Sequence, residues 1–124
     1  MSASTGSARK IAEEYVRAWL SGDVDTAMSL IADDIVGDAP TGQIVGRAAY
    51  RQFLEPFATS LLGSELTGVL GDDEHAAAAY VVQTPFARDF RGMEYLTVDG
   101  GKITRAVSVF DTAPIMRARA AAKG

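Results

Sequence analysis

The spacing of the apolar residues changes once along this chain, near Glu65, and the change limits the folds open to it. Before Glu65 apolar residues recur every three or four positions, which is typical of helices with one buried face. After Glu65 they alternate with other residues, which is typical of strands with one buried face. Helices come first in this chain, and strands that short turns can connect follow them. This order predicts an α+β domain with an antiparallel sheet.

Three helices are expected before this change. The first runs from about Ser7 to Ser21, and Gly22 can adopt the left-handed conformation that ends many helices. The second is short and extends from Asp23 to Asp34. The third begins at Gly46 and should end or kink near Pro56, because proline has no N–H to donate within a helix.

Four strands are expected after the change, separated by short turns. The segment Asp99-Gly100-Gly101 is a strong hairpin signal, because glycine adopts the positive φ angles that tight turns require. A further short strand, DIVGDAP, lies between the second and third helices and is stopped by Pro40. The four strands are ELTGVL (65–70), HAAAAYVVQTPF (75–86), GMEYLTV (92–98) and KITRAVSVFD (102–111).

Composition restricts the partners and cofactors. A length of 124 residues fits one domain, and a net charge of -4 argues against nucleic acid, which requires a concentrated basic face. The absence of cysteine and the single histidine, His75, exclude a thiolate or histidine-rich metal site, so no metal is expected. The sequence has no apolar run of membrane-spanning length and no signal-peptide pattern. We therefore expect a cytoplasmic protein with no membrane partner.

Three motifs occur in a characteristic order. They are Y-V-x-A-W-x-x-G-D at 15–23, L-I-A-D-D at 30–34 and P-T-G-Q-x-x-G-R at 40–47. This order resembles the nuclear transport factor 2-like superfamily, in particular its SnoaL-like and ketosteroid isomerase-like branch, from about Ala8 to Asp111. The resemblance implies a cone-shaped, curved antiparallel sheet wrapped around three helices, the cystatin-like α+β barrel. It also implies an apolar pocket at the open end and a homodimer formed through the outer face of the sheet.

The resemblance also suggests catalytic residues. Ketosteroid isomerases remove a proton next to a carbonyl with an aspartate base, while a tyrosine and a protonated aspartic acid stabilise the resulting oxyanion. Tyr15 matches the position of that tyrosine, and Glu94 matches the position of the acid with one more methylene. The base position falls on Ala39, one residue after Asp38. Side chains alternate along a strand, so Asp38 reaches the pocket only if a bulge, which Gly37 permits, precedes the turn.

Both acids have a second interpretation. Asp38 is either a tentative catalytic base or a carboxylate at the end of a strand. Glu94 is either buried among apolar residues, which would raise its pKa, or exposed and paired with an arginine. Ser108 faces either the pocket or a dimer partner. The expected substrate-binding residues, which form the core as well as the pocket wall, are Trp19, Tyr50, Phe53, Phe57, Ser108 and Phe110.

The domain boundaries and two functions complete these expectations. Residues 1–7 are expected to be a disordered lead-in, 8–112 the SnoaL-like domain and 113–124 a tail that either folds over the pocket or stays disordered. The resemblance implies an enzyme that uses no cofactor and acts by general acid/base chemistry on a small hydrophobic carbonyl compound, through isomerisation or cyclisation of an enolate. The alternative is a non-catalytic domain of the same fold that binds a hydrophobic ligand or only dimerises, which the mismatch at Ala39 favours.

Overall fold

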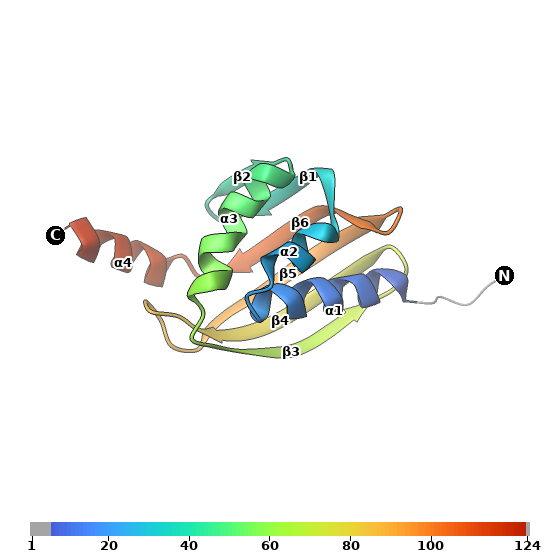
Figure 1. Ribbon diagram of the computed structural model, residues 1–124. Helices are drawn as coiled ribbons and strands as arrows, with labels where there is room; N and C mark the ends of the chain where they lie inside the picture. The colour runs from blue at the N-terminus through green and yellow to red at the C-terminus, as the bar shows by residue number, and fades with distance from the viewer. Residues whose placement is uncertain (1–5, 124) are drawn as a thin grey trace.

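A curved six-stranded sheet packs against three helices in this protein, and a fourth helix follows the last strand (Figure 1). The structure is a computed structural model and describes residues 6–123. In chain order the elements are α1 (Ser7–Leu20), α2 (Val24–Ser29), β1 (Ile31–Ala39), β2 (Gly42–Val45), α3 (Arg47–Ser60), β3 (Gly63–Gly71), β4 (His75–Gln83), β5 (Phe90–Asp99), β6 (Lys102–Phe110) and α4 (Ala113–Lys123).

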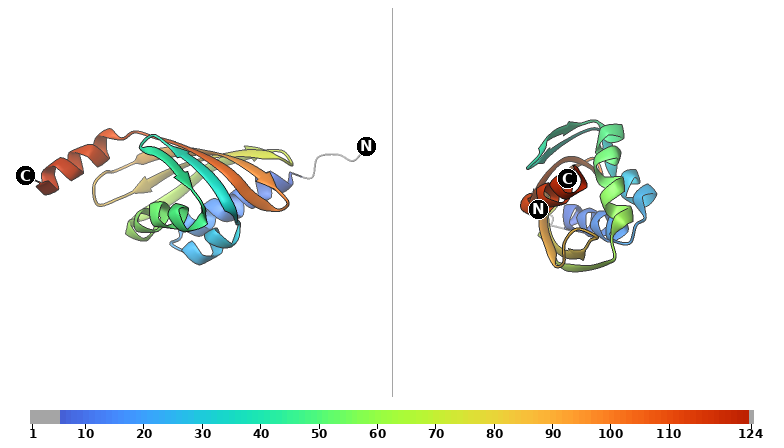
Figure 2. Two further views of the ribbon diagram at one scale, coloured as in Figure 1. Left: turned by 90° about the horizontal axis from the view of Figure 1, so that it is seen from above. Right: turned by 90° about the vertical axis from the view of Figure 1, so that its left-hand side faces the viewer.

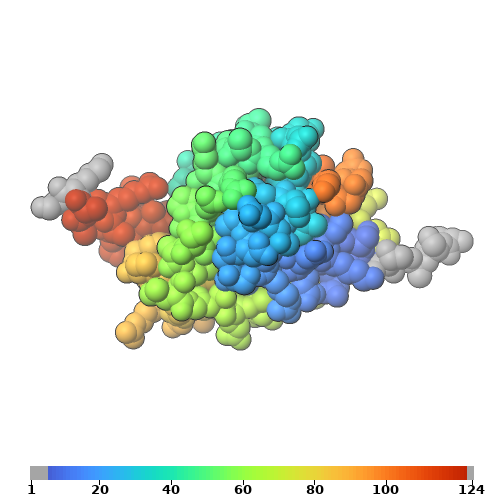
Figure 3. Space-filling view, in the orientation of Figure 1, coloured from blue at the N-terminus to red at the C-terminus, as the bar shows by residue number. Residues whose placement is uncertain are grey.

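The sheet has the strand order β2-β1-β6-β5-β4-β3 and is open at both edges. All neighbouring strands are antiparallel except β1 and β6, which run parallel. The expected α+β fold with a curved sheet is therefore confirmed, with this one parallel pair as a difference. Figure 2 shows the sheet curving over the helices, and Figure 3 shows α1, α2 and α3 covering one face of the sheet.

The helices present their apolar residues to the concave face of the sheet. Tyr15 and Val16 on α1 are fully buried, and Trp19 is 1% exposed. Gly22 has a φ of 84° and ends α1 as expected, after which the Asp23 carboxylate accepts a hydrogen bond from a backbone N–H of α2. The hairpin between β5 and β6 is also confirmed, because its two glycines have positive φ angles of 58° and 79°.

Three elements differ from the sequence expectations. The second helix ends at Ser29 rather than at Asp34, because Ile31 pairs with β6 and starts β1. The third helix does not end at Pro56 but continues to Ser60, and the buried Leu54 and Ala58 hold it against the core on both sides of the proline. The short strand β2 was not expected, and it pairs with β1 as a hairpin.

The two ends of the chain were expected to be a lead-in and a tail. Residues 1–5 of the expected lead-in lie outside the described residues, whereas Ser7 starts α1 and its backbone N–H donates to Asp73 at 3.1 Å. Residues 113–123 of the expected tail form the helix α4, which extends beyond the end of the sheet (Figures 1 and 2). Among the described residues, no helix is both long enough and apolar enough to cross a membrane.

Candidate active site

A cavity of about 310 Å³ lies between the inner face of the sheet, α1, α3 and α4. Aromatic side chains make most of its wall, which suits an apolar ligand. All six residues expected to bind substrate contribute to the lining. These six are Trp19 on α1; Tyr50, Phe53 and Phe57 on α3; and Ser108 and Phe110 on β6.

Glu94 is the only acidic residue among the described residues that line the cavity. It lies on β5, where Gly92, Glu94 and Leu96 alternate with exposed neighbours and face the inside of the sheet. Glu94 is 3% exposed, so the buried interpretation is the one that the structure adopts. The Trp19 indole N–H donates to one carboxyl oxygen at 3.1 Å, and the Tyr50 hydroxyl donates to the other at 3.4 Å.

Burial controls the ionisation of Glu94. Removal from water raises the pKa of Glu94 from its ordinary value of 4.5 to about 7, although hydrogen bonds from Trp19 and Tyr50 act in the opposite direction. A carboxyl group with this pKa is present in both its charged and its neutral form near neutral pH. Such a group can both accept and return a proton, which is what general acid/base catalysis requires.

The raised pKa of Glu94 predicts that the free energy of unfolding falls as the pH rises. The folded pKa of about 7 lies above the ordinary 4.5, so the folded protein binds more protons than the unfolded chain between these values. The resulting stabilisation is complete at low pH and is lost as the pH rises through the folded pKa, by about 3 kcal/mol in total. Urea unfolding at several pH values should show this loss for the wild type but not for Glu94→Gln. An identical pH dependence in both proteins would contradict the prediction.

Tyr15 lies behind Tyr50 and does not line the cavity. It is fully buried, and its hydroxyl oxygen is 2.9 Å from that of Tyr50. Burial raises the pKa of both tyrosines well above the ordinary value, so both keep their protons at neutral pH. The structure therefore brings Tyr15 and Glu94 together through Tyr50, whose role as the direct donor to Glu94 was not expected from the sequence.

Tyr80 on β4 adds a hydroxyl group to the cavity that the sequence did not indicate. Its ring packs edge-on against Trp19 with centroids 4.9 Å apart, and it lies across Gly92 on the neighbouring strand. The side chain is 5% exposed, and its hydroxyl makes no hydrogen bond within residues 6–123. Burial raises its pKa well above the ordinary value. Tyr80 is thus a protonated donor that is free to bond a ligand.

Gly92 makes room for the Tyr80 ring, and this can be tested by substitution. A Cβ at position 92 would lie 2.5 Å from the Tyr80 hydroxyl oxygen, and Trp19 limits how far the ring can move. Gly92→Ala should therefore lower the free energy of unfolding by about 1–3 kcal/mol. Gly68→Ala is the matched control on strand β3, where a Cβ would have no atom within 4 Å. Urea unfolding that gives equal effects for both variants would contradict this account of Gly92.

Asp38 lies outside the cavity. Its carboxylate pairs with Arg105 at 2.5 Å and accepts a hydrogen bond from the Gln43 side chain at 3.3 Å. The neighbouring Gly37 faces inward, since a Cβ there would lie 3.0 Å from the Tyr50 ring. The pairing of β1 is regular from residue 36 to residue 39, and its irregularity comes earlier, so no bulge turns Asp38 inward. The structure therefore does not bring the tentative base together with Glu94.

The tail contributes two residues to the cavity that sequence reasoning missed. Ile115 and Arg119 on α4 both belong to the lining. The sequence left open whether the tail folds over the pocket and singled out neither residue, because the position of α4 depends on how it packs against the rest of the domain. His75, by contrast, stacks on Tyr95, with centroids 5.7 Å apart, and does not line the cavity.

The fold and the cavity with its buried acid define a protein of the nuclear transport factor 2-like class. The model of the SnoaL-like domain family matches residues 12–106, and this chain therefore belongs to that family within the superfamily. No curated protein is similar enough in sequence to match the chain.

Solved structures agree with this assignment. A protein from Kribbella flavida DSM 17836 is 39% identical, with a TM-score of 0.91, and the match covers 96% of this chain and 98% of that one. A protein from Xanthomonas campestris, provisionally named a polyketide cyclase, is 23% identical with a TM-score of 0.72 over 90% and 95% of the two chains. A second Kribbella protein, provisionally named a ketosteroid isomerase, is 23% identical with a TM-score of 0.69 over 86% and 79%. The last two show likeness in fold alone.

Proposed function

We propose that this protein is an enzyme that transfers protons next to the carbonyl group of a small hydrophobic compound, without a cofactor. The observation that carries the proposal is Glu94, a buried acid with a pKa of about 7 in an apolar cavity. Perturbed acids in apolar pockets are typical of acid/base catalysts. The fold shared with proteins provisionally named polyketide cyclase and ketosteroid isomerase supports the same class of reaction.

In the proposed reaction, Glu94 is both base and acid. Its carboxylate removes a proton from the carbon beside the carbonyl, the electrons of that C–H bond form a C=C bond, and the carbonyl π electrons move to oxygen. The free hydroxyl of Tyr80 donates a hydrogen bond to this oxygen. Glu94 then returns the proton to another carbon; alternatively, the enolate carbon attacks a second carbonyl in a ring closure, and Glu94 returns the proton to the alkoxide oxygen that forms. Tyr15 acts as a positioning residue through Tyr50.

The reaction class can be tested without knowing the natural substrate. The hydrophobic ketone 2-tetralone exchanges the hydrogens beside its carbonyl with deuterium when a base removes them in D₂O. We expect the protein to accelerate this exchange, followed by NMR, above the rate in buffer. Failure to accelerate the exchange, with saturable binding of 2-tetralone, would instead support the second candidate.

The second candidate is a non-catalytic domain that binds a hydrophobic ligand. One observation favours it: Asp38 is paired with Arg105 outside the cavity, so the part of the chain that the structure describes gives the cavity one acid and not the two that the resemblance implies. A binding domain should be stabilised against heat by 2-tetralone. Such stabilisation without exchange would distinguish it from the enzyme, because an enzyme must do both.

We further propose that the protein is a homodimer formed through the outer face of the sheet. Met93 and Val109 pair across β5 and β6 on that face and are 51% and 61% exposed, next to Tyr95 at 50%. Exposed apolar side chains gathered in this way are typical of interfaces. Light scattering should give twice the chain mass of 13.1 kDa for the wild type and one chain mass for the double variant Met93→Lys, Val109→Lys. Leu62→Lys, at a residue 73% exposed elsewhere, should stay dimeric. A monomeric wild type would contradict the proposal.

A further inference from the structure

One face of α4 closes part of the cavity. Ile115 packs against the hydrophobic core and lines the cavity, and Arg119 follows it by four positions. Residues four apart lie on the same side of a helix, so the contact of Ile115 also directs Arg119 toward the cavity. Arg117 is two positions from each of them, lies on another side of the helix and does not line the cavity.

The charges of the cavity are separated along its depth. Glu94 is 3% exposed and belongs to the deep wall, whereas Arg119 is exposed and belongs to the mouth. Arg119 is the only basic residue among the described lining residues, and it forms no ion pair within residues 6–123. A guanidinium group keeps its charge at any physiological pH and matches the two oxygens of a carboxylate.

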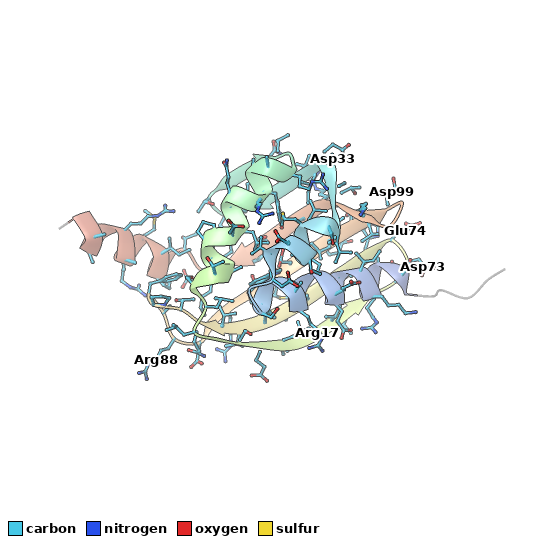
Figure 4. All side chains as sticks on the ribbon, viewed as in Figure 1. Arg17, Asp33, Asp73, Glu74, Arg88 and Asp99 are labelled. Carbon is cyan, nitrogen blue, oxygen red and sulfur yellow. The ribbon has the colours of Figure 1, made fainter. Side chains whose placement is uncertain are left out.

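The charge around α4 differs from that of the protein as a whole. The chain has a net charge of -4, yet α4 contains three basic residues and no acidic one. Asp73, Glu74 and Asp99 lie at the opposite end of the molecule from α4 (Figure 4). The helix α4 therefore brings positive charge to the mouth of the cavity, which favours an anion there.

We infer that the cavity binds an apolar carboxylic acid, with the carboxylate on Arg119 at the mouth and the apolar body among the aromatic side chains. The opposite orientation would put the anion beside Glu94, where two like charges repel each other. A phosphate dianion would need more donors than one arginine offers, whereas one guanidinium is enough for a carboxylate. The inference deepens the proposed function by naming the substrate class, and it depends on that function only for the chemistry at Glu94.

Two matched ligands test the inference by calorimetry on the full chain. 2-Naphthylacetate carries a carboxylate, and 2-naphthylacetamide carries a neutral amide of nearly the same shape. The wild type should bind the carboxylate about two- to fivefold more tightly than the amide, the range for one exposed ion pair. Arg119→Gln should remove this preference and leave amide binding unchanged. Arg117→Gln, on the same helix, should keep the preference.

Equal affinities for the two ligands in the wild type would overturn the inference, as would the absence of saturable carboxylate binding. If Arg117→Gln and Arg119→Gln reduced the preference for the carboxylate equally, the inference would also be overturned. The overall positive charge of α4 would then explain the preference. Glu94→Gln should keep the preference. A wild type that prefers the carboxylate and binds 2-tetralone saturably, but does not accelerate its exchange, would leave this inference standing and refute the proposed function.

Discussion

Replacing Glu94 by glutamine should lower the protein-dependent exchange rate of 2-tetralone by at least about 100-fold, the usual contribution of a positioned acid/base group. Glutamine has nearly the same shape and can still accept the Trp19 N–H through its amide oxygen, but it cannot carry a transferable proton. The rates are measured by NMR in D₂O for both proteins at the same concentration. Urea unfolding of the variant checks that its fold is kept.

Asp38→Asn is the matched control for this experiment. It also replaces an acid by its amide, but at a residue that pairs with Arg105 outside the cavity. We expect it to exchange 2-tetralone at the wild-type rate. A wild-type rate in Glu94→Gln, or a large loss in Asp38→Asn, would contradict the assignment of proton transfer to Glu94.

Replacing Trp19 by alanine should lower the free energy of unfolding by about 3–5 kcal/mol, the range for removing a large buried aromatic side chain. Trp19 is 1% exposed, and its ring contacts the rings of Phe57 and Tyr80. The substitution also removes a donor from the buried Glu94 carboxyl group. A loss of this size is a large part of the total stability of a typical domain, about 5–15 kcal/mol.

Met93→Ala is the control for Trp19→Ala, because Met93 is 51% exposed on the other face of the sheet. At a low protein concentration that limits association, its effect should stay within about 0.5 kcal/mol. Urea unfolding of both variants measures the difference. A loss below about 1 kcal/mol for Trp19→Ala would mean that the cavity wall is not part of the core that holds the domain together.

The order of helices and strands could be predicted from the sequence because it depends on local spacing. Tyr80 and Val82, like Leu96 and Val98, alternate with other residues within strands that were expected from the sequence, and all four are buried in the structure. Local spacing also misled at one point. Ile31 continues the helical pattern of the second helix, but its pairing with β6, more than 70 positions away, makes it part of a strand.

The candidate site was less predictable because its decisive contacts are not local. The alternation of β5 was compatible with an inward or an outward Glu94. The inward position depends on hydrogen-bond donors on α1 and α3, which stabilise the buried carboxyl group. The sequence showed that Asp38 lies one residue before the expected base position, but it did not show that β1 lacks the bulge that would turn Asp38 into the cavity. The contribution of Arg119 depends on the packing of α4, which no motif indicates. The catalytic roles of these residues stay predictions.

The ionisation of Glu94 tests the central claim most directly. Selective ¹³C labelling of glutamate carboxyl groups, with Glu94→Gln to assign the signal, allows the Glu94 carboxyl to be titrated by NMR in the folded protein. The account predicts a pKa of about 7, caused by burial in the cavity. A pKa at or below the ordinary 4.5 would contradict it, because the cavity would then not raise the affinity of the Glu94 carboxylate for the proton that it removes from the substrate.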